Sequence, residues 1–269
     1  MRCGQRVSPS APRVTRASGP SSRPRSPPEA GGVARLPRLY YPAAGPGVHR
    51  LHGDLAHRLT KVLRLREGDE LLLFAGDGHE WRATIRRAEP RTVLAEVLEL
   101  ARIGVPPRLV LDVRCALVRP QRFDWAVEKL TEAGADVIGA LVTERTTERQ
   151  GDGARLARWE RIAAEAAEQC GRLWVPAIAP AASLDEALRA AGGPIVVGHA
   201  CGLDFDAAAR RLPESGRLTV FVGPEGGFTE RELAAAEARG ALLASFGPYT
   251  FRSETAAVVA AALIRSRRG

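Results

Sequence analysis

Apolar and polar residues follow two different rhythms along this chain, and the change between them falls near residue 105. Before it, short runs rich in strand-forming residues follow one another, separated by turn residues; they are 38–41, 69–74, 81–85 and 92–97. Short strands at this spacing predict a small β-barrel or sandwich over residues 37–103. Between the first two runs, Leu55, Leu59, Val62 and Leu63 recur at helical spacing, which predicts an amphipathic helix capped by Asp54.

After a Gly-Val-Pro-Pro linker at 104–107, strand-like and helix-like segments alternate. The expected strands are 109–118, 137–142, 195–198, 218–222 and 242–246. The expected helices are marked by the apolar spacing of 123–130, 156–170, 184–191, 229–239 and 253–265. This alternation predicts an α/β domain with a mostly parallel sheet over residues 108–269.

The first 36 residues carry no such pattern. They contain seven arginines, one acid, six prolines, six serines and no aromatic residue, a composition typical of disorder. We consider three explanations: an arm that attracts RNA, an arginine-rich targeting segment, or a start site assigned too far upstream. The third is favoured, because Val33 directly precedes the first patterned segment and a GTG start codon would be read there as valine.

The net charge of +8 is unevenly distributed, which limits what it says about partners. Residues 1–36 carry +6, residues 37–102 carry +2, and residues 103–269 are neutral. The overall basicity is therefore weak evidence for nucleic-acid binding by the patterned part of the chain.

Several classes of protein are disfavoured by simple counts. The longest apolar run, Ala256–Ile264, has nine residues and is too short to cross a bilayer. The cysteines form no CxxC pair, and the histidines show no metal-ligand spacing; the four cysteines are Cys3, Cys115, Cys170 and Cys201. We therefore expect no disulfide framework, no metal site and a cytoplasmic location. Cys170 lies on the apolar stripe of its helix and is expected in the core.

The most distinctive local feature is the glycine-rich turn Gly223–Gly227, which follows a buried strand. Thr229 and Glu232 form a capping box that fixes the start of the next helix. Ligands of open α/β sheets bind at the carboxyl ends of strands, where glycines allow close backbone approach. The sequence is neither a P-loop nor a GxGxxG fingerprint, and spacing alone is equally compatible with a turn that binds nothing.

A similar construction follows about 20 residues later, where the strand 242–246 leads into a loop and a helix. Ser253 is a suitable N-cap, and Glu254 in the first turn complements the helix dipole. Arg252 precedes the helix start, where it could bind an anion or a polar base edge. If the two turns are adjacent, they form one continuous pocket lined by backbone.

Two groups of polar residues favour contact with RNA or with a partner. Arg58, Lys61 and Arg64 lie off the apolar stripe and form a basic ridge suited to phosphates, although a solvated helix face is the alternative. On the long helix, Glu165, Gln169 and Arg172 lie near one another at i, i+4 and i+7; surface pairing of Arg172 with Glu168 is the alternative there.

Together these residues resemble a known signature. Gly223-Pro224-Glu225-Gly226-Gly227, followed by Phe246-Gly247-Pro248-x-x-Phe251-Arg252-x-Glu254-Thr255-Ala256, looks like that of the bacterial 16S ribosomal RNA uracil-N3 methyltransferases of the SPOUT superfamily. Upstream segments agree with the family in order, and they are 38–40, 57–64, 128–134, 143–145 and 158–176. The resemblance covers residues 37–265. Thr250, Phe251 and Ala133 depart from the family's usual aliphatic residues.

The resemblance implies a PUA-like RNA-binding domain at 37–103 and a SPOUT domain with a deep trefoil knot at 108–269. It further implies a homodimer that binds S-adenosylmethionine (SAM) and acts on 16S rRNA in the small ribosomal subunit, near the decoding site. The cofactor-binding residues it implies are Val222, Gly223, Glu225, Gly226, Gly227, Phe246, Gly247, Tyr249, Phe251 and Arg252. The expected RNA-binding residues are Arg38, Arg58, Lys61, Arg64, Arg145 and Arg172.

The chemistry needs orientation of uracil N3 toward an activated methyl group and removal of the N3 proton. Arg252 is the candidate for holding the uracil oxygens or the uracil anion. Glu225 and Glu254 are candidates for positioning or proton acceptance. Two alternatives stay open: a SPOUT methyltransferase with another RNA target, and a non-catalytic RNA-binding factor in ribosome assembly.

Overall fold

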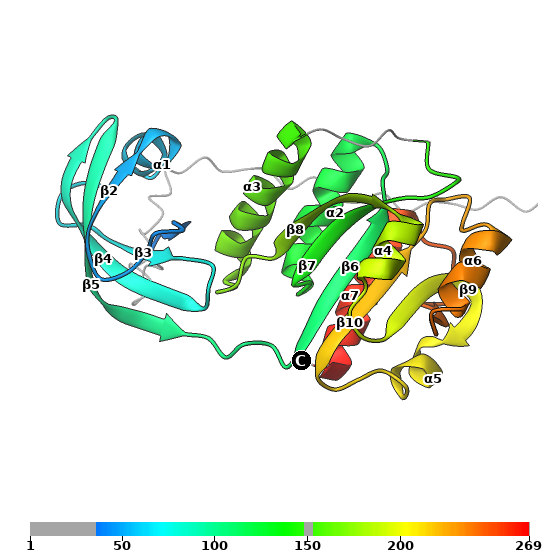
Figure 1. Ribbon diagram of the computed structural model, residues 1–269. Coiled ribbons are helices and arrows are strands. Elements are labelled where there is room, and N and C mark those ends of the chain that lie inside the picture. Colours follow the sequence, from blue (N-terminus) through cyan, green and yellow to red (C-terminus); the bar gives the residue numbers. More distant parts are fainter. Residues whose placement is uncertain (1–35, 148–152, 269) are drawn as a thin grey trace, which may run out of the picture. The chain divides into compact units, whose positions relative to one another are not determined.

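The computed structural model describes residues 36–147 and 153–268, which form two sheets with their own cores (Figure 1). Apart from Leu36, the arginine-rich segment 1–36 lies outside the described residues. No helix in the described ranges is long and apolar enough to cross a membrane.

The first sheet has five strands in the order β1-β3-β4-β5-β2. The strands are β1 (Arg38–Tyr40), β2 (Gly47–His52), β3 (Glu70–Phe74), β4 (His79–Glu89) and β5 (Thr92–Ile103). β1 pairs with β3 in parallel, and the other neighbours are antiparallel. Alternate side chains from all five strands form one buried cluster, which confirms a small β domain in this part of the chain.

The prediction of one continuous α-helix over 54–63 is wrong. A short α1 (Gly53–His57) continues into a π-helical turn η1 (Arg58–Val62). Ala56 and Leu59 enter the core, whereas Val62 and Leu63 are exposed, and Arg64 has left the helix with a positive φ of 57°. The wider π turn changes the angle between successive side chains, so the i, i+7 and i+8 positions no longer share one face.

The second sheet has six parallel strands in the order β11-β9-β10-β6-β7-β8. They are β6 (Leu109–Ala116), β7 (Val137–Val142), β8 (Ala177–Ser183), β9 (Ile195–Asp204), β10 (Gly216–Val222) and β11 (Leu242–Ser245). The predicted α/β class with a parallel sheet is confirmed. β2 and β8 were not predicted, and β9 is longer than expected.

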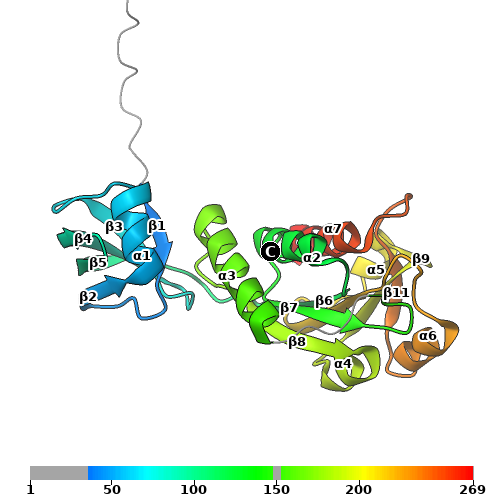
Figure 2. The ribbon, with the colours of Figure 1, turned by 90° about the horizontal axis from the view of Figure 1, so that it is seen from above.

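Helices cover both faces of this sheet (Figure 2). They are α2 (Pro120–Glu132), α3 (Gly153–Cys170), α4 (Leu184–Ala190), α5 (Phe205–Ala209), α6 (Glu230–Glu237) and α7 (Ser253–Arg268). Along β10, Val220 and Val222 pack with α2 and α7, whereas Phe221 packs on the opposite face with α4 and α6. Strands buried on both faces explain why β6 and β10 are nearly continuous apolar runs.

The strand order corrects one expectation about the two glycine-rich turns. β10 and β11 are not neighbours, because β9 lies between them. The turns after β10 and β11 therefore lie at the same edge of the sheet, but the end of β9 separates them.

Candidate functional site

The turn after β10 is held in place by the start of α6. The hydroxyl of Thr229 accepts a hydrogen bond from the Glu232 backbone N–H, and the Glu232 side chain accepts one from the Thr229 N–H, so the predicted capping box is confirmed. The other oxygen of Glu232 accepts from the Glu144 N–H at 2.9 Å. One buried glutamate thus joins the turn after β7 to the turn after β10.

The glycines of this turn meet the geometric demands of a close approach. Gly227 has a φ of 69°, and its N–H donates to the Pro224 carbonyl at 2.8 Å. A Cβ on Gly223 would lie 3.0 Å from the Phe228 ring. Larger side chains at these positions would either strain the turn or displace the ring beneath it.

The second predicted loop runs from Phe246 to Arg252 between β11 and α7. Tyr249 is 80% exposed, and Gly247 lies against the ring of Phe251. The Arg252 side chain is exposed and has no hydrogen bond or ion pair within the described residues. Its carbonyl accepts from the Ala256 N–H, so Arg252 stands immediately before α7 at the carboxyl edge of the sheet.

One arginine contacts both predicted catalytic carboxylates. Arg122 Nη1 donates to Glu225 Oε1 at 3.2 Å, and Arg122 Nε lies 3.8 Å from Glu254 Oε1. Glu225 is 54% exposed, whereas Glu254 is 8% exposed. The guanidinium therefore connects the first turn of α2, the turn after β10 and the first turn of α7.

A cavity of about 330 Å³ opens beside this arginine. Arg119, Arg122 and Arg145 line it together with Glu225 and Gly226, and Arg145 Nη1 donates to the Gly226 carbonyl at 2.5 Å. A larger hollow of about 600 Å³ lies between α2 and α3; Glu165 and Gln169 of the expected contact group line it, and none of the expected catalytic or cofactor-binding residues does. The cavity at the carboxyl edge therefore brings together Arg145, expected to bind RNA, and Glu225, expected at the catalytic site, with two arginines that the prediction omitted.

Cys115 lies buried beside the start of α7. Its thiol is fully buried at the end of β6 and lies 3.6 Å from the Ser253 carbonyl. Burial raises the pKa of the Cys115 thiol far above its ordinary value, and the charges of Glu254 and Glu225 raise it further. A thiol in this state is neutral and poorly nucleophilic.

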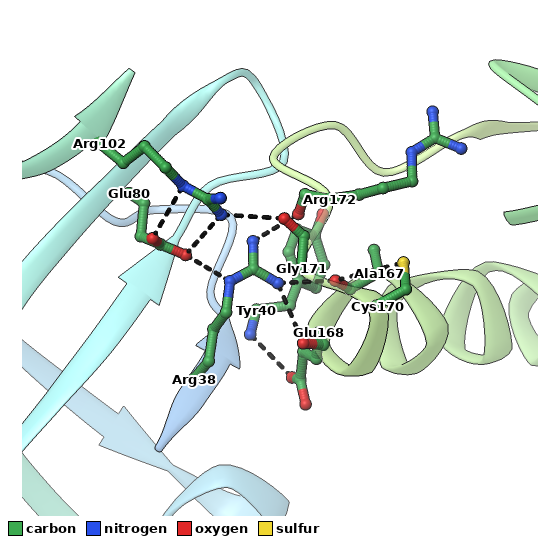
Figure 3. A network of polar contacts seen from close by, with 9 residues as sticks. All are labelled: Arg38, Tyr40, Glu80, Arg102, Ala167, Glu168, Cys170, Gly171 and Arg172. Carbon is green, nitrogen blue, oxygen red and sulfur yellow. Dashed lines mark hydrogen bonds and ion pairs between the residues drawn. The ribbon is translucent and has the colours of Figure 1, made fainter. Parts of the chain in front are cut away.

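Two residues expected to bind RNA are instead enclosed by protein. Arg38 is 7% exposed; it pairs with buried Glu80 and donates to the Ala167 carbonyl at 2.6 Å and the Glu168 carbonyl at 3.2 Å (Figure 3). Its guanidinium also lies 3.7 Å from the centre of the Phe74 ring. Because its donors are occupied inside the chain, Arg38 joins the first sheet to the end of α3 and is not an accessible cation for RNA.

Arg172 is likewise used internally. It donates to the carbonyls of Thr131 and Ala135 at 2.9 and 2.6 Å and pairs with Asp136 at 3.1 Å. The alternative pairing of Arg172 with Glu168 is wrong, because Glu168 accepts from the Tyr40 N–H at 2.7 Å and pairs with Arg58 at 2.6 Å.

Two other expectations about single residues are wrong. Cys170 is exposed at the last position of α3, beyond the part of the helix that packs. Ser253 begins α7, but its buried hydroxyl has no hydrogen-bond partner in the described chain, so it is not a side-chain cap.

The basic ridge keeps its charge but not its predicted spacing. Lys61 and Arg64 are exposed, while Arg58 is partly exposed and paired with Glu168. Because η1 ends at Val62, Arg64 projects from a separate turn rather than from a continuing helix. Three cations still lie within one short, accessible segment of the first domain.

Two arginines at the cavity, Arg119 and Arg122, were not predicted from the sequence as site residues. They follow β6, and only the strand order places the end of β6 beside the end of β10. A general rule could have identified these two arginines, since side chains just after neighbouring parallel strands meet at one edge of the sheet. Applying it required knowing which strands are neighbours.

Comparison with known proteins agrees with this arrangement. Residues 106–265 match the family model of an RNA methyltransferase domain, and residues 51–98 match an RNA methyltransferase PUA domain. A ribosomal RNA small subunit methyltransferase E from Synechocystis sp. is 33% identical over 217 residues, covering 78% of this chain and 70% of the relative. One from Mycobacterium bovis is 34% identical, covering 77% and 82%.

Solved structures give the same result. A methyltransferase of Legionella pneumophila, solved with bound SAM, matches with a TM-score of 0.76 and 28% identity, covering 86% of this chain and 98% of that one. A ribosomal RNA small subunit methyltransferase E of Neisseria gonorrhoeae, also bound to SAM, matches with a TM-score of 0.74, 29% identity and the same coverage. This chain therefore belongs to the ribosomal RNA small subunit methyltransferase E family.

Proposed function

We propose that this protein transfers the methyl group of SAM to N3 of one uridine in 16S rRNA of the small ribosomal subunit, near the decoding site. The observation that carries the proposal is the grouping at the carboxyl edge of the second sheet. There, two glycine-containing loops, a shared arginine and two carboxylates gather, and the free side chain of Arg252 stands exposed immediately before α7. Because the proposed substrate is the small ribosomal subunit, we expect the protein to act in the cytoplasm.

The chain offers what SAM requires. The glycines of the loops Gly223–Gly227 and Phe246–Arg252 allow a ligand to approach the backbone closely, and buried Val222 ends the strand before the first loop. Two buried polar atoms beside them, Ser253 Oγ and Glu254 Oε2, have no hydrogen-bond partner within the described residues. Unpartnered buried polar atoms are uncommon in folded proteins, and a polar ligand would satisfy them. When bound, SAM supplies a methyl group already activated by a sulfonium.

The remaining chemistry falls to side chains of this chain. We assign Arg252 to the uracil oxygens, because a guanidinium with free donors binds such an acceptor and stabilises negative charge on the ring. Glu225 is exposed beside the cavity and can accept the N3 proton. Correct placement of the base contributes most of the remaining acceleration.

The path of the chain into α7 supports a knot. β11 is the edge strand, yet α7 begins three strands further in, where Ser253 meets Cys115 of β6. The loop Phe246–Arg252 must therefore return across the end of β9 and β10. We propose that this return forms the deep trefoil knot, and that the protein acts as a homodimer, as the resemblance implies.

RNA contact is assigned to the accessible cations. Arg58, Lys61 and Arg64 on the first domain and Arg145 at the cavity offer phosphate contacts, and the matched PUA domain is the expected partner for structured RNA. The target base must be unpaired or extruded to reach the cavity.

Methyl transfer tests the proposal directly. Purified protein and SAM are incubated with small subunits that lack rRNA uridine methylation, and the RNA is mapped by nuclease digestion and mass spectrometry. One added methyl on N3 of one uridine is expected. A methyl on ribose or another base would overturn the substrate assignment, and RNA binding without methylation would favour an assembly factor.

A further inference from the structure

Two features of Glu254 narrow the kind of ligand group that it can bind. It is a buried carboxylate, and its Oε2 atom has no hydrogen-bond partner in the part of the chain that the structure describes. Leaving a buried charged oxygen without a donor is costly, and such a group calls for a specific explanation. Its helix-dipole role at the start of α7 explains its sign but not its burial.

The charges around Glu254 do not balance. Within the described residues, Arg122 is the one cation at ion-pair distance from Glu254, and the same guanidinium donates to Glu225. Two carboxylates thus share one positive charge. Cys115 adds no further negative charge, because burial raises its thiol pKa and keeps it neutral. Arg119 and Arg145 line the cavity beside Glu225, but within the described residues neither pairs with Glu254, so Glu254 Oε2 has no cationic donor of its own.

The missing group is a cationic hydrogen-bond donor. A neutral donor would satisfy Oε2 but leave the charge unbalanced, whereas an ammonium would do both. SAM carries one such group, the α-ammonium of its amino-acid end. The sulfonium is also positive, but it has no N–H to donate.

We propose that Glu254 binds the α-ammonium of the SAM amino-acid end, and that Arg122 is a positioning residue that holds the Glu254 carboxylate for this contact. Arg122 acts on Glu254 Oε1, which leaves Oε2 for the ligand. The assignment rests on the proposed use of SAM and separates the two carboxylates: Glu254 serves the cofactor, and Glu225, which is exposed, serves the substrate.

Calorimetry with the intact protein tests this without methyl transfer. The probes are S-adenosylhomocysteine, its analogue in which hydrogen replaces the α-amino group, and 5′-methylthioadenosine, which has no amino-acid end. Wild-type protein should bind the deamino analogue about 10- to 100-fold more weakly than S-adenosylhomocysteine. This measurement needs no variant and so does not depend on how one folds.

The variant Glu254→Gln then closes the cycle. Its affinity for S-adenosylhomocysteine should fall about 10- to 100-fold, so that it binds S-adenosylhomocysteine and the deamino analogue almost equally. Its affinity for 5′-methylthioadenosine should equal that of the wild type. Glu237→Gln, a substitution of an exposed glutamate at the end of α6, is the matched control and should change none of the three.

Three outcomes would overturn the assignment. Equal wild-type affinity for S-adenosylhomocysteine and its deamino analogue would remove the ammonium contact. An equal loss for 5′-methylthioadenosine in Glu254→Gln would show that the residue serves the nucleoside or the fold. Loss of amino-group discrimination in Glu225→Gln instead would assign the contact to Glu225. None of these results depends on which RNA atom is methylated, so they are separable from failure of the proposed substrate.

Arg122→Ala tests the positioning role. It should reduce discrimination between S-adenosylhomocysteine and its deamino analogue, with partial recovery in Arg122→Lys, because an ammonium restores the charge but not the guanidinium geometry. Unchanged discrimination in Arg122→Ala would contradict the role.

Discussion

Arginines occupy two regions of this molecule in opposite ways. Where the first sheet meets α3, Arg38 is largely buried, and its donors are taken by a carboxylate and by backbone carbonyls (Figure 3). Arg172 is largely buried too, and it donates to two backbone carbonyls and pairs with Asp136. At the carboxyl edge of the second sheet, Arg252 and Arg119 are exposed, and the described residues provide no side-chain partner for either. An arginine with internal acceptors stabilises the fold, whereas one without them is available to a ligand.

The difference also separates the carboxylates. Glu80 lies between Arg38 and Arg102 and has two cations for one negative charge. Glu254 shares Arg122 with Glu225 and has less than one. Backbone carbonyls accept hydrogen bonds from the two cations beside Glu80, whereas no described residue donates to Glu254 Oε2.

The largest expected effect is on folding, from Arg38→Ala. Removing one partner of a buried ion pair leaves Glu80 with reduced compensation, and the free energy of unfolding should fall by about 3 to 5 kcal/mol. Urea denaturation measures this. Arg82→Ala in the same sheet, which breaks a half-exposed pair with Glu99, should cost under about 1 kcal/mol. Native stability with weakened RNA binding would instead make Arg38 an RNA contact.

A smaller effect is expected on RNA affinity from Lys61→Ala. If Lys61 contacts phosphate, the slope of log affinity against log salt should become shallower by about 0.7 to 0.9, with unfolding unchanged. Filter binding to small-subunit RNA across a salt series measures the slope. Arg210→Ala, an exposed arginine after α5, should leave it unaltered. The same slope in Lys61→Ala as in wild type would remove this residue from the surface.

Thr229→Ala should produce a still smaller change, shared between stability and ligand binding. Loss of the cap costs about 1 kcal/mol of unfolding free energy, and it loosens the turn that precedes α6. Ser183→Ala removes the equivalent capping box of α4, away from the glycine-rich turn. We expect similar stability in both variants but weaker S-adenosylhomocysteine binding in Thr229→Ala alone. Equal binding would show that the cap does not position the turn.

The smallest expected effect concerns Cys115. Since burial raises its thiol pKa, the thiolate fraction is below that of an ordinary cysteine at every pH. Iodoacetamide at pH 8 should leave the Cys115 peptide unmodified in native protein while labelling the peptide with exposed Cys201. Peptide mapping by mass spectrometry checks this. Labelling of Cys115 at the rate of Cys201 would indicate an open path to the end of β6.

The sequence predicted most elements because their signals are local. The capping box of Thr229 and Glu232, the strands β6, β7 and β10, and the change from a small β domain to an α/β domain all follow from neighbouring residues. The short edge strand β2 and the alanine-rich β8 were missed, because neither carries a clear apolar alternation.

What the sequence did not provide was the environment of its charged residues. Arg38 and Arg252 look alike in one dimension, each beside apolar residues at the end of an element. Their difference is made by distant segments: the end of α3 supplies acceptors to Arg38, and no described residue forms a hydrogen bond or ion pair with the Arg252 side chain. Arg122 was missed for the same reason, since its partners are about 100 and 130 residues away.

The most direct test of the account is single-turnover methyl transfer by Arg252→Ala on unmethylated small subunits, at saturating SAM. The expected rate is about 100- to 1,000-fold below wild type, with the free energy of unfolding unchanged, because an exposed guanidinium stabilises the reacting base and not the fold. A wild-type rate in a folded Arg252→Ala variant would contradict the central claim.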